Sequence, residues 1–209
     1  MKKLLLFSFL IAQTFIYPIP STVCIVRHAE KQIEKEPSMD GERQDMHAKS
    51  GAVLYSNDLS VKGWERAYAL APFFEKKHEN MPYAPPSALF CPSISKKHPS
   101  LRPLQTLTPL AGKLQMKIQQ LYEPEEYAKL AQKIMSDPLY DGKVVLISYQ
   151  HQWIPSLARA FGADMAPHNW NGSVFDRVWV IQFDQKSETP KIIHFENRPQ
   201  QLLYGDSEK

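Results

Sequence analysis

Short, uninterrupted apolar runs are the feature of this sequence that most limits the folds open to it. Three such runs read as strands: 22–26 (TVCIV), 87–93 (SALFCPS) and 143–149 (KVVLISY). The first and the third hardly alternate between apolar and polar residues, which is typical of strands buried on both faces. Such strands belong to parallel sheets that are covered by helices on both sides.

Helical patterns separate these runs. Segments with helical spacing or helix-start signals lie at 59–77, 102–114, 123–135 and from "QHQW" to Gly162. Ser60 is a suitable N-cap for the first segment, and Pro72 inside it predicts a kink or an early end. Two further strands, at 176–183 and 191–197, read as a hairpin. We therefore expect one α/β domain, a three-layer α/β/α sandwich with a mostly parallel central sheet.

The N-terminus has the composition of an export signal. "MKK" is a short basic segment, and the apolar run "LLLFSFLIAQTFIY" after it is short for a membrane span. We expect residues 1–20 to be a signal peptide and residues 21–209 to form the domain of an exported protein, periplasmic or secreted. No small-x-small motif marks the cleavage site, and an uncleaved N-terminal anchor is the alternative. After cleavage we expect no stable membrane insertion.

Composition argues against several other classes of protein. The formal net charge is +3 and the basic residues are dispersed, so nothing indicates nucleic-acid binding. The seven histidines and two cysteines show no zinc-site spacing, and we expect neither a metal nor a cofactor. Cys24 and Cys91 both lie in apolar runs, where buried free thiols are commoner than a disulfide, although an exported protein could pair them.

Cationic and imidazole side chains follow two of the apolar strands. Arg27 and His28 come directly after 22–26, and His151 comes just after 143–149. We expect these two strands to be central neighbours, and ligands bind at the carboxyl ends of parallel strands. Together with Arg102, the histidines and Arg27 would form an anion pocket. Guanidiniums match phosphate oxygens, and an imidazole among cations stays neutral and nucleophilic.

Four segments, in order, resemble motifs of the histidine phosphatase superfamily, which includes cofactor-dependent phosphoglycerate mutases and acid phosphatases. They are "VRHAEK", "LSVKGWERA", "RPLQTLTPLA" and "VVLISYQH", and the resemblance spans residues 22–197. It implies a phosphoglycerate mutase-like fold and metal-independent chemistry. It also implies that His28 becomes phosphohistidine. In the same way, Arg27 and Arg102 would bind phosphoryl oxygens, with His151 as the fourth pocket residue.

The resemblance does not identify the residue that protonates the leaving group. Gln152 follows the second histidine, where acid-phosphatase-like members carry their proton donor. Mutase-like members use a glutamate after the second arginine, and Glu123 lies in roughly that place. We take Glu123 as the third catalytic residue after the two histidines, with Asp58, Glu42 and Asp45 as rivals.

The function expected from these residues is hydrolysis of a phosphomonoester through a phosphohistidine intermediate on His28. The substrate would be a small phosphorylated molecule or a phosphoprotein. Two alternatives stay open, a phosphoglycerate mutase-like phosphotransferase and a non-catalytic phosphate-binding module. The mutase would need a second phosphate pocket, and the binding module would keep the anion site without turnover.

Overall fold

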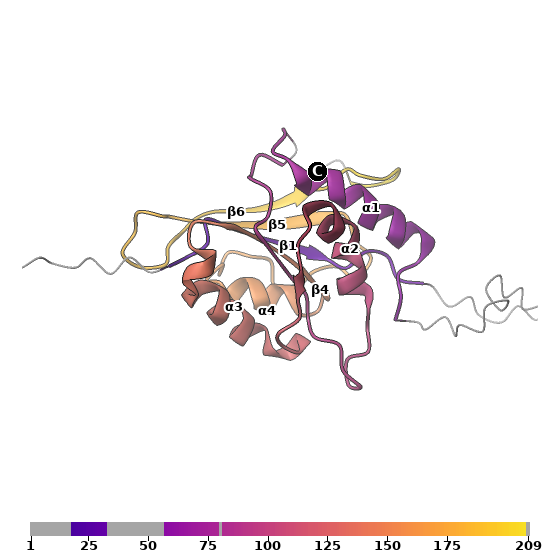
Figure 1. Cartoon of the computed structure of the whole chain (residues 1–209), viewed down its shortest axis with the longest axis horizontal. Coiled ribbons are helices and arrows are strands. Elements are labelled where there is room, and N and C mark those ends of the chain that lie inside the picture. The colour runs from indigo at the N-terminus through magenta and orange to yellow at the C-terminus, as the bar shows by residue number, and fades with distance from the viewer. Residues whose placement is uncertain (1–17, 33–56, 80, 208–209) are drawn as a thin grey trace, which may run out of the picture.

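A six-stranded sheet forms the centre of the molecule. The computed structural model describes residues 18–32, 57–79 and 81–207. The strand order is β3-β2-β4-β1-β5-β6 (Figure 1). The strands are β1 (Thr22–Arg27), β2 (Ala88–Phe90), β3 (Ile118–Gln119), β4 (Val144–Tyr149), β5 (Arg177–Phe183) and β6 (Ile192–Pro199). β3, β2, β4 and β1 run parallel, whereas β5 is antiparallel to both β1 and β6, so the predicted mostly parallel sheet and the predicted hairpin are confirmed.

Helices cover both faces of this sheet (Figure 1). They are α1 (Val61–Glu75), α2 (Arg102–Leu114), α3 (Tyr127–Ser136) and α4 (Ile154–Ala160), with the 3-10 helices η2 (Pro124–Glu126) and η3 (Pro138–Tyr140). α1 and α2 pack against each other on one face, and α3 and α4 pack on the other. The predicted three-layer α/β/α sandwich is therefore confirmed.

Alternate residues of β1 supply the two cores. Cys24 and Val26 belong to the core under α1 and α2, whereas Val23 and Ile25 belong to the core under α3 and α4. None of the four side chains is exposed. Because both faces of β1 are apolar, the strand is stable only in the middle of the sheet, between β4 and β5. The predicted adjacency of 22–26 and 143–149 is thus confirmed.

Helix α1 follows the sequence-based prediction at its start and departs from it near its end. Ser60 is the N-cap, and its Oγ accepts a hydrogen bond from the Gly63 amide at 3.0 Å. The helix continues through Pro72 to Glu75, so the predicted early end is wrong. Pro72 withholds a hydrogen bond from the carbonyl of Tyr68, a residue that is 66% exposed, so water can bond that carbonyl instead.

Residues before β1 also belong to the folded domain. Ile19 is only 3% exposed, and its carbonyl accepts a hydrogen bond from the Gly142 amide at 2.9 Å. The rest of the expected signal peptide, 1–17, and the rival carboxylates Glu42 and Asp45 lie outside the described residues. Within the described ranges, no helix combines the length and the apolar character that crossing a membrane requires.

The two cysteines are free thiols in this structure. Cys24 and Cys91 are both buried. Burial raises the pKa of each thiol to about 12. A thiol that stays protonated is a poor nucleophile, so neither cysteine is a candidate for the chemistry of the site.

Candidate functional site

The carboxyl end of β1 positions the Arg27–His28 pair. Arg27 is the last residue of β1 and is in register with Tyr149 at the end of β4. The His28 amide donates to the Tyr149 carbonyl at 2.9 Å. Both side chains are nearly inaccessible, with 2% of Arg27 and 3% of His28 exposed. They lie at the sheet edge where ligands bind in α/β proteins.

The loop between α4 and β5 encloses the Arg27 guanidinium. Nη1 of Arg27 donates to the carbonyls of Gly172 and Val174, at 2.6 and 3.0 Å. The Phe175 ring covers the guanidinium, with 3.6 Å between Cζ and the ring centroid. Burial, and after it the charge of Arg102, lowers the pKa of Arg27 to about 10, and the charge of Glu30 acts against this shift. Nε is buried without a hydrogen-bond partner, so an anion bound here would meet an unused donor.

His28 is held as a neutral imidazole of defined tautomer. Its Nδ1 lies 2.8 Å from the Ala29 carbonyl oxygen. A carbonyl oxygen can only accept, so Nδ1 carries the proton and Nε2 keeps its lone pair. Burial lowers the pKa of His28 to about 3; the charges of Arg102, Arg27 and His151 act in the same direction, and the Ala29 hydrogen bond opposes them. His28 therefore stays unprotonated at Nε2 well into the acid range.

Arg102 begins α2 and is tied to the His28 segment. Its Nε donates to Ser100 Oγ at 3.1 Å. Its carbonyl accepts from Thr106 Oγ1 at 2.8 Å, and the same hydroxyl oxygen accepts from the Ala29 amide at 2.8 Å. Burial lowers the pKa of Arg102, and the carboxylate of Asp58 acts against that shift. The start of α2 is thus fixed against the residue that follows His28.

His151 lies beneath the loop that encloses Arg27. A Cβ added at Gly172 would be 3.3 Å from Nε2 of His151, so the loop backbone approaches the imidazole closely. Burial lowers the pKa of His151, as do the charges of Arg27, Lys31 and Arg102. Arg27, Arg102 and His151, the residues expected to form an anion pocket with His28, thus lie close enough to His28 for their charges to lower its pKa.

Glu123 lies in a polar cluster with His98 and Glu125. It precedes η2, and its amide donates to Glu126 Oε2 at 3.0 Å. Its carboxylate lies 3.8 Å from Nε2 of His98, which is 2.7 Å from Glu125 Oε2. The ligand atoms of His98, Glu123 and Glu125 lie within 4.8 Å of one another and could hold a metal ion, although Lys97 already pairs with Glu125. The Tyr149 hydroxyl donates to the carbonyl of Pro124, which places η2 beside the end of β4.

Asp58 is the described rival to Glu123 as proton donor. Gln105 Nε2 donates to Asp58 Oδ1 at 2.7 Å, and Gln105 Oε1 accepts from the Leu59 amide at 2.9 Å. These contacts fix Asp58 just before α1, where its charge acts on Arg102. Of the four carboxylates considered as proton donors, Asp58 and Glu123 lie within the described residues.

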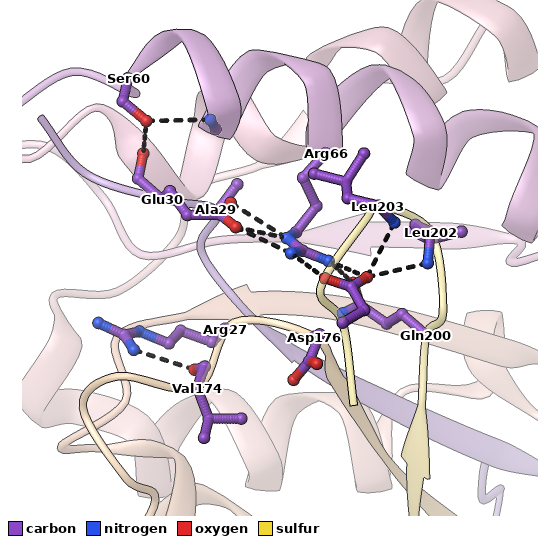
Figure 2. A network of polar contacts seen from close by, with 12 residues as sticks. Arg27, Ala29, Glu30, Ser60, Arg66, Val174, Asp176, Gln200, Leu202 and Leu203 are labelled. Carbon is purple, nitrogen blue, oxygen red and sulfur yellow. Dashed lines mark hydrogen bonds and ion pairs between the residues drawn. The ribbon is translucent and has the colours of Figure 1, made fainter. Parts of the chain in front are cut away.

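The segment "LSVKGWERA" fastens the residue that lies two positions after His28 (Figure 2). The amide and the hydroxyl of Ser60 both donate to the Glu30 carbonyl, at 2.9 and 3.2 Å. A Cβ at Gly63 would be 2.3 Å from the same oxygen, so only glycine allows this approach of α1. Arg66 donates to both carboxylate oxygens of Glu30, at 2.8 and 3.0 Å. The spacing of the motif thus follows from three contacts with Glu30.

Sequence reasoning missed several residues that shape the pocket. The acceptors for Arg27 are the backbone carbonyls of Gly172 and Val174, which leave no mark in the side-chain pattern. Phe175 and Thr106 were also missed. The one available signal was the polar, aromatic-containing stretch "HNWNGSVFD" after the second histidine, which is typical of a loop at a site.

Comparisons with known proteins give structural matches only. No family model matches this chain, and no curated protein does. SixA from Agrobacterium tumefaciens, assigned as a phosphohistidine phosphatase, is 15% identical with a TM-score of 0.47, over 85% of this chain and 99% of that one. A mycobacterial glucosyl-3-phosphoglycerate phosphatase is 11% identical with a TM-score of 0.49, over 86% and 98% of the two chains. A phosphoglycerate mutase from Bacillus anthracis is 13% identical with a TM-score of 0.45, over 85% and 94%. All three are members of the histidine phosphatase superfamily.

Proposed function

We propose that this chain is a histidine phosphatase that hydrolyses phosphomonoesters, with Nε2 of His28 as the nucleophile. The observation that carries the proposal is the state of His28. Its Nδ1 proton is hydrogen-bonded to the Ala29 carbonyl, so the Nε2 lone pair is available, and the charges of Arg102 and Arg27 help to keep the imidazole neutral. The order of the four sequence segments that resemble this superfamily also supports it.

The reaction proceeds in two displacements. In the first, Nε2 of His28 forms a bond to phosphorus while the bond from phosphorus to the leaving oxygen breaks. Arg27 and Arg102 neutralise the phosphoryl oxygens, and Nε of Arg27 has no protein partner to give up. His151, whose Nδ1 also has no partner, hydrogen-bonds the transferred group. In the second displacement water attacks phosphorus, the bond to His28 breaks, and inorganic phosphate leaves.

A labelling experiment tests the nucleophile. The protein is incubated with a ³²P-labelled phosphomonoester and quenched in alkali, which preserves phosphohistidine. We expect alkali-stable, acid-labile label on the wild-type protein and none on His28→Asn. A protein that binds phosphate but shows neither label nor turnover would be a binding module. Transfer of the label to a phosphoglycerate in place of water would indicate the mutase.

The leaving-group proton comes from a carboxylic acid, for which Asp58 and Glu123 are the candidates. p-Nitrophenolate leaves without protonation, whereas an alkoxide does not. Loss of the true donor should therefore slow an alkyl phosphate far more than p-nitrophenyl phosphate. Comparing Asp58→Asn with Glu123→Gln on both substrates identifies the donor. Equal losses on the two substrates in both variants would exclude both residues.

We propose a small phosphorylated molecule or a phosphoprotein as the substrate, since the pocket residues described here read only the phosphoryl group. A panel of low-molecular-weight phosphomonoesters and phosphopeptides, compared by kcat/KM, separates the two classes. A preference of more than about tenfold, equal to about 1.4 kcal/mol, would decide between them.

We also propose that the protein is exported and that its signal peptide is cleaved before Ile19. Ile19 packs in the core beneath α3 and α4, so cleavage after residue 20 would remove part of that core. N-terminal sequencing of the exported protein should give Ile19 or a residue upstream of it as the first residue. An intact Met1 on protein retained in the cytoplasm would contradict export.

A further inference from the structure

A buried polar network centred on Arg66 joins the His28 segment to the C-terminus (Figure 2). Arg66 is 2% exposed. On one side its guanidinium binds the Glu30 carboxylate. On the other side it donates to both carboxylate oxygens of Asp206, at 2.7 and 2.9 Å, and to Gln200 Oε1 at 3.1 Å. One guanidinium therefore connects residues near the two ends of the domain.

The C-terminal residues that meet Arg66 form a folded turn. Asp206 Oδ2 accepts hydrogen bonds from the amides of Leu202 and Leu203, at 2.9 and 3.0 Å (Figure 2). The side chain of Asp206 is only 4% exposed. Arg66 thus binds a carboxylate whose position is already set by its own turn, so the contact is specific and not an incidental surface ion pair.

The same C-terminal segment also holds the loop that encloses Arg27. The amide and the hydroxyl of Ser207 donate to Asp176 Oδ2, at 2.5 and 2.6 Å. The Gln200 amide donates to the Asp176 carbonyl at 2.8 Å. Asp176 directly follows Phe175, the ring that covers the guanidinium of Arg27. The segment therefore contacts Arg66, which binds Glu30 near His28, and Asp176, which is next to Phe175.

The path from Arg66 to His28 is short. The carbonyl that accepts the Nδ1 proton of His28 belongs to the peptide unit between Ala29 and Glu30. Glu30 is held at its carboxylate by Arg66 and at its own carbonyl by Ser60. Because this anchoring restricts the peptide plane, it also restricts the direction in which Nε2 of His28 points.

We propose that residues 200–207 act as a clamp on the pocket and that Arg66 and Asp206 are positioning residues for His28. This inference rests on the proposed function, because its main readout is turnover. Reacting atoms must be aligned closely for in-line attack, so a small rotation of the imidazole is enough to slow the reaction. The clamp has a second arm through Asp176, which acts on Arg27 and so on phosphate affinity.

Asp206→Asn tests the first arm, because it removes the charge and keeps the side-chain shape. We expect kcat on p-nitrophenyl phosphate to fall about tenfold, with the Kd for inorganic phosphate changed less than about twofold. Asp176→Asn should have the opposite pattern: it should weaken phosphate binding more than Asp206→Asn does and lower kcat less. Glu188→Gln, an exposed carboxylate in the β5–β6 turn, is the matched control and should change neither. If Asp206→Asn does not fold, Arg66→Lys tests the same arm, since its single ammonium cannot bind both carboxylates as a fork.

A spectroscopic readout separates positioning from simple loss of stability. ¹⁵N-histidine NMR, assigned with His28→Asn, reports whether Nδ1 of His28 keeps its proton in folded Asp206→Asn. We expect a mixture of tautomers in the variant and one tautomer in the wild type. Unchanged kcat and an unchanged His28 spectrum in Asp206→Asn would overturn the clamp. A wild-type protein without turnover would instead overturn the proposed function, and the spectrum would still test the clamp.

Discussion

Arg27 and Arg66 are equally buried, but their surroundings shift their pKa values in opposite directions. Each side chain is 2% exposed. Burial acts to lower the pKa of Arg66, but hydrogen bonds from its guanidinium to Asp206 and Glu30 more than offset this and raise the pKa above its ordinary value. The Arg27 guanidinium donates to two backbone carbonyls and packs against an aromatic ring. Burial lowers its pKa to about 10.

The difference supports the proposal that Arg27, and not Arg66, binds the ligand. A buried charge is costly unless the fold supplies hydrogen bonds and a counter-charge, and Arg66 has both. Arg27 has oriented acceptors on one nitrogen and an unused Nε, and the nearby Glu30 carboxylate, whose charge acts to raise the pKa of Arg27, is hydrogen-bonded to Arg66. We infer that a bound anion supplies the missing counter-charge and acceptors of Arg27, whereas the protein itself supplies those of Arg66.

Arg66→Met gives the sharpest test of this comparison. It leaves Glu30 and Asp206 buried without their shared cation, which should lower the free energy of unfolding by about 3–5 kcal/mol. Urea unfolding of wild type and variant measures it. A cost below about 1 kcal/mol would mean that the network is as weak as a surface ion pair.

Arg27→Met should damage activity and spare stability. Loss of a phosphate-binding guanidinium should reduce kcat/KM on p-nitrophenyl phosphate by about 10²–10³-fold, equal to about 3–4 kcal/mol. Because the lost charge was only partly compensated, the free energy of unfolding should stay the same or rise. If Arg27→Met unfolds as readily as Arg66→Met, the two arginines do not differ in kind.

Acid should affect the two regions over different pH ranges. The folded-state pKa of His28, about 3, lies below its ordinary value of 6.5, so between these values only the unfolded chain binds the proton. Stability should therefore fall as the pH drops from 6.5 towards 3, by at most about 1.4 kcal/mol per pH unit for this group. Burial acts to raise the pKa of Asp206, but the hydrogen bonds from Arg66 hold it at about 2. The contribution of Asp206 to stability is therefore lost only below about pH 4.

His28→Asn checks this assignment. Between pH 4.5 and about 6.5 its stability should depend less on pH than that of the wild type, because one titrating group has been removed. Urea unfolding at half-unit pH intervals gives both slopes. Equal slopes in this window would mean that His28 does not titrate as its burial implies.

Added phosphate should give the smallest effect. At ten times its Kd, a ligand that binds only the folded state adds about 1.4 kcal/mol to the free energy of unfolding. We expect this gain in the wild type and its loss in Arg27→Met at the same phosphate concentration. Thermal melts with sodium chloride of matched ionic strength provide the control. An equal gain in Arg27→Met would place the anion elsewhere.

The sequence predicted the adjacency of the strands that carry Arg27, His28 and His151, but not the network around Arg66. Arg27 and His28 follow a run that is apolar on both faces, and the run that precedes His151 is similar, so both strands had to be central and adjacent. Arg66 and Asp206 are 140 residues apart, and a carboxylate near the chain end has no periodic pattern that points to its partner. The proposed orientation of His28 thus depends on the ion pairs of Arg66 with Glu30 and Asp206, which local sequence patterns do not predict.

The sequence also could not decide between Glu123 and Asp58 as the proton donor. Position after the second arginine favoured Glu123, but its carboxylate lies beside His98 and Glu125. Asp58 is positioned by Gln105, a residue on α2 that is 47 positions away. Contacts between a loop and a distant helix depend on how the layers pack, which motif spacing does not determine.

The contact between Arg66 and Asp206 joins residues that are 140 positions apart, which has a consequence for biosynthesis. While the ribosome still encloses residue 206, Arg66 can bind Glu30 but not its second carboxylate, and α1 cannot bury the guanidinium at low cost. We expect nascent chains stalled with residue 206 inside the exit tunnel to be protease-sensitive, and chains stalled after residue 206 has left the tunnel to be resistant. Equal resistance in both would show that the domain closes without the turn that holds Asp206. The nascent domain should therefore stay open until residue 206 has emerged.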